Sequence, residues 1–156
     1  MKIFTAPDKV LSQEAKSIDK IDAEVLELVD KMWSTLGQAG GVGLAAPQIG
    51  RSIRLAIVGF EPTPEQKEKN PKIQSVPRKV LINPKIVWSS KDMNTDREGC
   101  LSLPKVEVDV ARHKKIHVVH LDKKGKKQKT KARGYSARVI QHELDHLNGK
   151  LITDYK

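Results

Sequence analysis

The sequence Gln-His-Glu-Leu-Asp-His occupies residues 141–146, and its two histidines are four positions apart. On a helix this spacing puts His142 and His146 one turn apart on the same face, so both imidazoles can reach one divalent ion. Glu143 follows the first histidine, where its carboxylate can take a proton from the attacking water. The motif predicts a metal centre with Glu143 as general base. A surface helix with two exposed histidines is the alternative.

The residues around the motif predict the helix that such a centre needs. Ser136 is the expected N-cap, and the Asn-Gly pair at 148–149 is the expected stop. The apolar positions have helical spacing, which indicates that one side of the helix packs in the core. These positions are Val139, Ile140, Leu144 and Leu147.

The third metal ligand is expected upstream of this helix. The third histidine of metzincin proteases is replaced here by Ile152, and Asp154 is the only carboxylate that follows the motif. Cys100 is the best remaining residue, because two imidazoles, a thiolate and a water leave the open position that a hydrolytic site requires. The alternative is a small buried hydrophobic residue. The other histidines are expected to pack or to face solvent, and they are His113, His117 and His120.

Length and composition favour one α+β domain over residues 1–156. Hydrophobic residues make up 38% of the chain and aromatic residues 4%, so the core must rest on Val, Ile, Leu and Ala. A single cysteine excludes an intramolecular disulfide and favours a reducing compartment. No apolar run approaches the ~18 residues of a membrane span, and no secretory signal is present. We expect a cytoplasmic protein with no membrane partner; an organellar location also fits.

Nearly all of the net charge lies in the segment 112–133. This segment holds ten basic residues and one acid, a net charge of +9 out of the +10 of the whole chain. A β-rich stretch at 116–121 followed by Lys-Lys-Gly-Lys-Lys at 123–127 predicts a hairpin with a lysine-rich tip. The hairpin is either a solvated edge that resists aggregation or a phosphate contact, for example on the ribosome. No aromatic residue interleaves the lysines, so base stacking is not expected, and nothing indicates specific DNA binding.

The remaining sequence predicts a second helix, several strands and a loop. Apolar residues at helical spacing indicate a helix over 21–36, ended by the glycines that follow. Strands are expected at 53–58, 80–83, 86–88 and 106–110, and a surface loop at 61–77. The expected architecture is α+β, with short antiparallel sheets around the central His-Glu-x-x-His helix and an N-terminal helix.

A glycine-rich segment at 40–50 lies between the first helix and the first strand. It lacks the Gly-Lys-Ser/Thr ending of a phosphate-binding loop. Its glycines permit the main chain to approach an extended ligand closely, and Gln48 can donate to a developing oxyanion. A tight turn with a structural glutamine is the alternative.

Three segments together resemble the signature motifs of the peptide deformylase family, in the right order. They are Gly-Val-Gly-Leu-Ala-Ala-Pro-Gln at 41–48, Glu-Gly-Cys-Leu-Ser at 98–102, and the helical motif at 141–146. The resemblance spans nearly the whole chain. It implies a metal-dependent hydrolase that removes the formyl group from the initiator methionine of nascent polypeptides and releases formate.

The resemblance also implies roles for the metal and its neighbours. A ferrous ion would be held by Cys100, His142 and His146, with Zn²⁺, Ni²⁺ or Co²⁺ able to replace it. Glu143 would act first as general base and then as general acid.

The other motif residues would bind the substrate. Gln48 and the backbone N–H of Leu101 would stabilise the oxyanion. Val42, Gly43 and Gly99 would offer main-chain partners to the extended peptide.

Two departures from the family pattern affect these expectations. The chain ends ten residues after His146, which indicates a compact member without the long C-terminal tail of many bacterial relatives, so ribosome docking through such a tail is not expected. Arg97 stands where an acidic residue is common and alters the charge near Cys100.

Two other functions compete with the deformylase interpretation. A metallopeptidase that cuts internal bonds lacks support because no downstream ligand is present. An RNA- or ribosome-binding module with a degenerate metal site conflicts with the intact ligands and Glu143.

Overall fold

The computed structural model describes residues 1–156 and contains two antiparallel sheets. The strands are β1 (Gly43–Ala45), β2 (Leu55–Phe60), β3 (Val76–Ser89), β4 (Met93–Cys100), β5 (Leu103–His113), β6 (Lys115–Leu121) and β7 (Lys127–Arg133). The helices are α1 (Ala23–Ala39), α2 (Pro64–Lys69) and α3 (Gly134–Leu147), with 3₁₀ helices at Lys9–Ser12, Ala46–Ile49 and Ile152–Tyr155. The larger sheet has the order β1-β2-β3-β6-β7, and β4 pairs with β5 alone. The predicted α+β architecture is confirmed.

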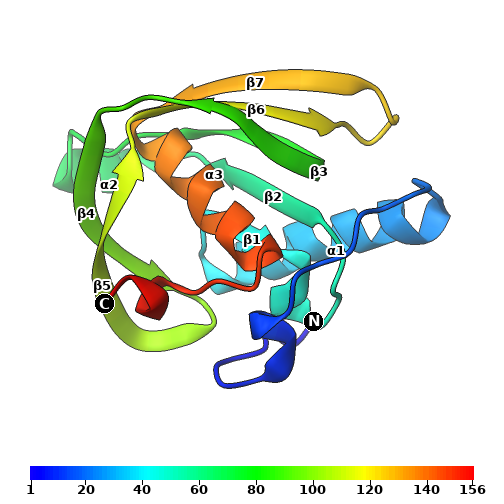
Figure 1. Cartoon of the computed structure of the whole chain (residues 1–156). Coiled ribbons are helices and arrows are strands. Elements are labelled where there is room, and N and C mark those ends of the chain that lie inside the picture. The colour runs from blue at the N-terminus through cyan, green and yellow to red at the C-terminus, as the bar shows by residue number, and fades with distance from the viewer.

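Helix α3 lies between the two sheets, as Figure 1 shows. Its apolar side packs on the inner face of the larger sheet, which explains why the motif helix is central. This core cluster includes Val58, Leu81, Ile116, Val118, Val139, Ile140 and Leu144. Burying an apolar side chain of this size contributes about 1.5–3 kcal/mol relative to exposure, so the packing fixes the helix firmly.

The two ends of α3 depend on glycines with positive φ. The helix begins at Gly134, directly after β7, and its N-cap Arg133 makes no side-chain cap bond. The expected N-cap at Ser136 is therefore wrong, because Gly134 at φ 60° turns the strand straight into the helix. The predicted stop is confirmed, with Asn148 as C-cap and Gly149 at φ 72°.

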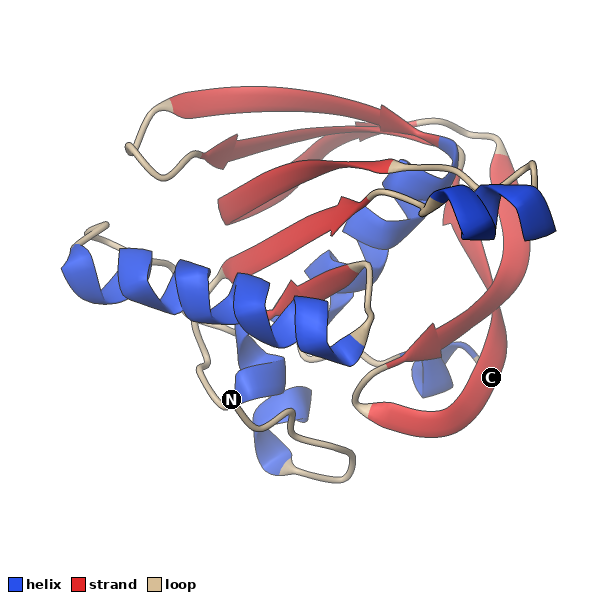
Figure 2. Ribbon diagram, turned by 180° about the vertical axis from the view of Figure 1, so that it is seen from behind, coloured by secondary structure: helices blue, strands red, loops and turns tan.

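Helix α1 packs on the opposite face of the larger sheet. Asp22 caps its start by accepting a hydrogen bond from the Val25 N–H at 3.0 Å, and Gly40 at φ 67° ends it. Its buried residues meet Leu44, Leu55 and Ile57 of β1 and β2 in one core cluster. Figure 2 shows that α1 crosses β1 and β2 and leaves the β6–β7 hairpin uncovered on this side.

Three segments differ from the sequence expectations. The predicted strands at 80–83 and 86–88 are parts of one long strand, β3. Its pairing with β6 shifts register between Ile82 and Lys85 and again between Ile86 and Trp88. The predicted loop at 61–77 contains α2, which Thr63 caps. Strand β4 was not expected, because most of its residues are polar. None of the helices is both long and apolar enough to cross a bilayer.

Candidate metal centre

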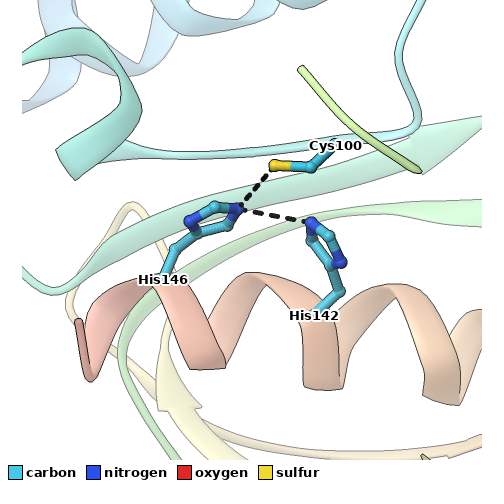
Figure 3. A group of neighbouring side chains, drawn as sticks. All are labelled: Cys100, His142 and His146. Atoms are coloured by element: carbon cyan, nitrogen blue, oxygen red, sulfur yellow. Dashed lines mark hydrogen bonds between the residues drawn. The ribbon is translucent and has the colours of Figure 1, made fainter. Parts of the chain in front are cut away.

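Three ligand atoms from two elements converge, as Figure 3 shows. Helix α3 supplies His142 and His146, whose Nε2 atoms are 3.3 Å apart. Cys100, at the end of β4, brings its Sγ to 3.4 Å from the Nε2 of His146. The three ligand atoms lie within 4.8 Å of one another.

These separations fit one tetrahedral ion. Two imidazole nitrogens that bind a zinc-sized ion at 2.0–2.1 Å lie roughly 3.4 Å apart when the ligand angle is tetrahedral. The observed distance of 3.3 Å between the histidine nitrogens agrees with this value. A thiolate with two imidazoles suits several divalent transition metals, so the ligand set fits a metal without choosing among them.

Glu98 holds the first histidine in place. Its buried carboxylate accepts a hydrogen bond from Nδ1 of His142 at 2.9 Å, which points Nε2 toward the other ligands. Arg112 donates two hydrogen bonds to Glu98, at 2.8 and 2.9 Å, and Arg138 donates a third. Burial raises the pKa of Glu98, but the hydrogen bonds from Arg112 and His142 outweigh it and lower the pKa to about 2.

Arg112 extends this network to the C-terminal 3₁₀ helix. The guanidinium pairs with Asp145, and its Nη1 donates to the Tyr155 hydroxyl at 3.1 Å. Tyr155 in turn donates to Asp145 at 2.7 Å. Removing one partner of a buried ion pair costs about 3–5 kcal/mol, so Arg112 is a structural requirement of the site.

The two histidines differ in charge. Burial lowers the pKa of His146 to about 3, assisted by the positive charges of His142 and Arg112, so this imidazole is neutral and its lone pair is free. Burial also disfavours charge on His142, but hydrogen bonds with Cys100 and Glu98 outweigh it and raise the pKa to about 10. The raised pKa of His142 thus depends on its hydrogen-bond partners on both sides of the ring.

Glu143 is buried beside the ligands, and its Oε2 has no hydrogen-bond partner. Burial raises the pKa of Glu143 to about 7. Its side chain lies against Gly43 of β1, where an added Cβ would stand 2.6 Å from the Oε1 of Glu143. The Glu143 carboxylate occupies the space that a side chain at position 43 would need, which explains the glycine there.

Gln48 is buried in the 3₁₀ helix that follows β1, with 1% of its surface exposed. Its Oε1 accepts a hydrogen bond from the Ala45 N–H at 2.9 Å, which fixes the side-chain amide. The Nε2 then faces Ser102 Oγ at 3.2 Å and Cys100 Sγ at 3.9 Å. The amide hydrogens of Gln48 thus point toward Ser102 and toward Cys100, which is one of the three converging ligands.

The structure brings all nine predicted site residues together. One pocket of about 360 Å³ is lined by eight of them, and His146 lies behind it in contact with His142 and Cys100. The eight are Val42, Gly43, Gln48, Gly99, Cys100, Leu101, His142 and Glu143.

Other residues singled out in the sequence have different surroundings from the three converging ligands. His113, His117 and His120 are in β5 and β6. Arg97, on the pocket rim, forms ion pairs with Glu107 at 2.9 Å and Asp109 at 3.5 Å.

Sequence reasoning missed the residues that support the ligands. Glu98 was quoted within a motif without a role, and Arg138 was not singled out. Arg112 was counted in the basic segment, but its side chain is buried and paired rather than on the surface. The sequence did contain a signal for Glu98, which lies two residues before the predicted ligand Cys100. Metal-binding histidines usually donate their second N–H to a carboxylate, so an acid in this position is a candidate partner.

Three converging ligands, a buried carboxylate and an adjacent open pocket define the class of metal-dependent hydrolases. The family model described as polypeptide deformylase matches residues 1–156, and the chain belongs to this family. The predicted resemblance is confirmed.

Individual relatives agree over nearly the full length of the chain. A peptide deformylase of Dictyoglomus thermophilum is 44% identical over 147 residues, covering 94% of this chain and 86% of the relative. The structure of a probable peptide deformylase from Synechococcus phage S-SSM7 is 38% identical, with a TM-score of 0.87, covering 100% of this chain and 99% of that one. A Met-Ala-Ser-bound peptide deformylase structure from Acinetobacter baumannii is 32% identical, with a TM-score of 0.90, covering 99% and 96%.

Proposed function

We propose that residues 1–156 form one catalytic unit that removes the formyl group from the N-terminal formyl-methionine of nascent polypeptides and releases formate. The observation that carries this proposal is the convergence of Cys100, His142 and His146 beside the unpartnered Oε2 of Glu143. The Met-Ala-Ser peptide bound to the Acinetobacter baumannii relative supports a methionine-containing peptide as the ligand.

Cys100, His142 and His146 would hold one divalent ion through Sγ and the two Nε2 atoms. Fe²⁺ is the proposed native metal, with Zn²⁺, Ni²⁺ or Co²⁺ as substitutes. When bound, the ion supplies Lewis-acid activation of the attacking water and of the formyl oxygen. Because the protein provides three ligands, a position remains for these oxygens.

Glu143 would carry the proton from the nucleophile to the leaving group. Its buried Oε2 accepts a proton from the attacking water as the water oxygen bonds to the formyl carbon. The same oxygen then gives the proton to the methionine nitrogen as the C–N bond breaks, so a free amine and formic acid form. The acid loses its remaining proton to solvent and leaves as formate. A pKa of about 7 lets the carboxylate accept and return a proton near neutral pH.

Gln48 and Leu101 would stabilise the oxyanion that forms on the formyl group. The Nε2 of Gln48 is fixed on the pocket side by the bond that its Oε1 accepts from Ala45. Leu101 follows Cys100 directly and lines the same pocket, where its backbone N–H is the second donor. Two such donors aimed at one oxygen are the arrangement that accelerates acyl transfer.

The substrate peptide would lie as an extended strand between two open sheet edges. β1 is an outer strand of the larger sheet, and β4 pairs only with β5. Val42 and Gly43 at one edge and Gly99 at the other line the pocket, so their backbone groups can bond the peptide. Val42 and Val139 would contact the methionine side chain.

The direct test is formate release from formyl-methionyl peptides by protein loaded with Fe²⁺ under anaerobic conditions. We expect turnover of formylated peptides and none of the same peptides without the formyl group. Internal cleavage of unformylated peptides would favour the metallopeptidase alternative, and absence of formate release would refute the proposal.

Substituting Gly43 with alanine tests whether Glu143 must hold its position. The new Cβ would stand 2.6 Å from the Glu143 carboxylate, which must shift. We expect formate release to fall about 10²-fold, because a misplacement of about 1 Å can cost that much. Metal content, measured by elemental analysis, should stay unchanged.

Gly37→Ala is the matched control. Gly37 is an exposed residue of α1, and an added Cβ would meet nothing within 4 Å. This variant should keep its activity and gain about 0.5–1 kcal/mol in free energy of unfolding, since alanine favours helices. Activity of Gly43→Ala close to that of the wild type would show that the position of Glu143 is not critical.

A further inference from the structure

The face of the larger sheet turned away from α3 carries a row of cations on β7. Lys127, Lys129, Lys131 and Arg133 alternate along the strand and are all exposed, while the residues between them are half-buried. Alternate residues on a strand are roughly 6.5 Å apart. This spacing is comparable to that of successive phosphates in an extended nucleic acid strand.

The charge of this row is not neutralised by neighbouring acids. None of the four side chains takes part in an ion pair, whereas Lys31, Lys67 and Lys69 on other surfaces each pair with a glutamate. The one acid of the hairpin, Asp122, accepts hydrogen bonds from the turn backbone and from Gln128 instead. The row therefore presents an open positive field to solvent.

The fold places an aromatic pair, the exposed Trp88 and the half-buried His117, beside the row. Trp88 of β3 is opposite His117 of β6, and His117 is opposite Lys131 of β7, so the three residues follow one another across the sheet. The Trp88 and His117 ring centroids are 4.6 Å apart, and 47% of Trp88 is exposed. No aromatic residue interleaves the lysines in the sequence, but the fold brings Trp88 close to them, because β3 lies next to β6 in the sheet.

We propose that this face binds an unpaired strand of ribosomal RNA, with phosphates along β7 and bases on the aromatic pair. The RNA-binding face is defined by Trp88, His117, Lys127, Lys129, Lys131 and Arg133. An aromatic ring open to solvent can stack only on a base that is not already stacked in a helix, which favours single-stranded over duplex RNA. The choice of ribosomal RNA rests on the proposed function, since its substrate emerges from the ribosome.

RNA on this face would leave the catalytic pocket open. His117 alternates along β6 with Ile116 and Val118, which point to the opposite face and pack against α3. None of the residues of the RNA-binding face lines the pocket at Cys100. Figure 1 shows α3 against one face of the sheet to which β6 and β7 belong. The protein can therefore hold RNA and accept a nascent chain at the same time.

The first test measures binding of a labelled single-stranded oligouridylate by fluorescence anisotropy as salt increases. With four phosphate contacts, one for each cation of the row, affinity should fall roughly fiftyfold between about 50 and 200 mM salt. Replacing Lys127, Lys129 and Lys131 together with Gln should lower affinity at least tenfold and reduce the log–log salt slope by about 2. Trp88→Ala should weaken binding about tenfold without changing the slope, and Trp88→Phe should restore most of the loss.

The matched control replaces Lys31, Lys67 and Lys69 with Gln, which removes the same charge from other surfaces. It should bind RNA as the wild type does. In co-sedimentation with purified ribosomes, the affinities of all variants should follow the same order as their affinities for the oligouridylate. Equal losses in both triple variants, no effect of Trp88→Ala, or a preference for duplex RNA, acidic protein or anionic vesicles would overturn the proposal. Formate release from short peptides, measured on the same samples, reports separately on the proposed function.

Discussion

Replacing Glu143 with glutamine should lower formate release by about 10³-fold or more, since a positioned general base contributes typically 10²–10⁴-fold and this residue serves in both proton transfers. Glutamine keeps the shape of the side chain against Gly43 but cannot accept the proton at Oε2. Metal content should not change, because Glu143 is not among the three converging ligands.

The stability of this variant separates lost chemistry from lost fold. Burial raises the pKa of Glu143 to about 7, which means that the folded protein favours the protonated, neutral form. A neutral glutamine resembles that form, so thermal unfolding at pH above 7 should occur at an equal or higher temperature than in the wild type.

Glu65→Gln is the control for the Glu143 variant. It makes the same chemical change on exposed α2, where Glu65 pairs with Lys69. Its formate release should equal that of the wild type. If Glu143→Gln kept a tenth or more of the wild-type turnover, Glu143 would not be the proton carrier.

The helices were predictable because their signals are local. In α3 the histidine spacing and the apolar positions lie within one segment, so His142 and His146 could be placed on one face before any tertiary contact was known. In α1 the same periodicity predicted 21–36, and the observed Ala23–Ala39 differs only where Asp22 caps the start and Gly40 ends the helix.

Strand β4 could not be predicted in the same way. Its first six residues are Met-Asn-Thr-Asp-Arg-Glu, a polar run without the alternation of a half-buried strand. It is a strand because β5 pairs with it along its whole length, from Met93 opposite His113 to Cys100 opposite Leu103. The consequence is functional, because this pairing carries Glu98 and Cys100 to α3.

The residues around the ligands were hidden for a related reason. Arg112 is opposite Asn94 in the β4–β5 register, yet its side chain reaches Glu98, which is opposite Val108. Arg138 reaches the same carboxylate from α3. In the sequence Arg112 belongs to a basic run, and nothing local separates it from the exposed lysines. Tertiary structure alone decides which cation of this run is buried. The three motifs, in contrast, could be recognised from their own residues.

Replacing Cys100 with alanine should remove most of the bound metal. The Sγ is one of three ligand atoms, and two histidines from one helix turn bind an ion weakly without a third ligand. After dialysis, elemental analysis should find less than about a tenth of the wild-type metal. Even the loss of a residue that only supports a ligand lowers metal affinity about 10–100-fold, and Cys100 is a ligand itself. Thr95→Ala, an exposed truncation on the same strand, should keep its metal.

A chemical measurement on the wild type tests the same ligand without any substitution. Cys100 is the only cysteine of the chain and is partly accessible, so any alkylation by iodoacetamide reports on this thiol. A thiolate bound to a metal cannot use the same lone pair on an alkylating agent, so loading with Zn²⁺ should slow modification at least tenfold, and a chelator should restore it. Equal alkylation rates with and without metal, or full metal content in Cys100→Ala, would show that the ion is held by other residues. The coordination position that the reacting oxygens need would then have to lie elsewhere in the pocket.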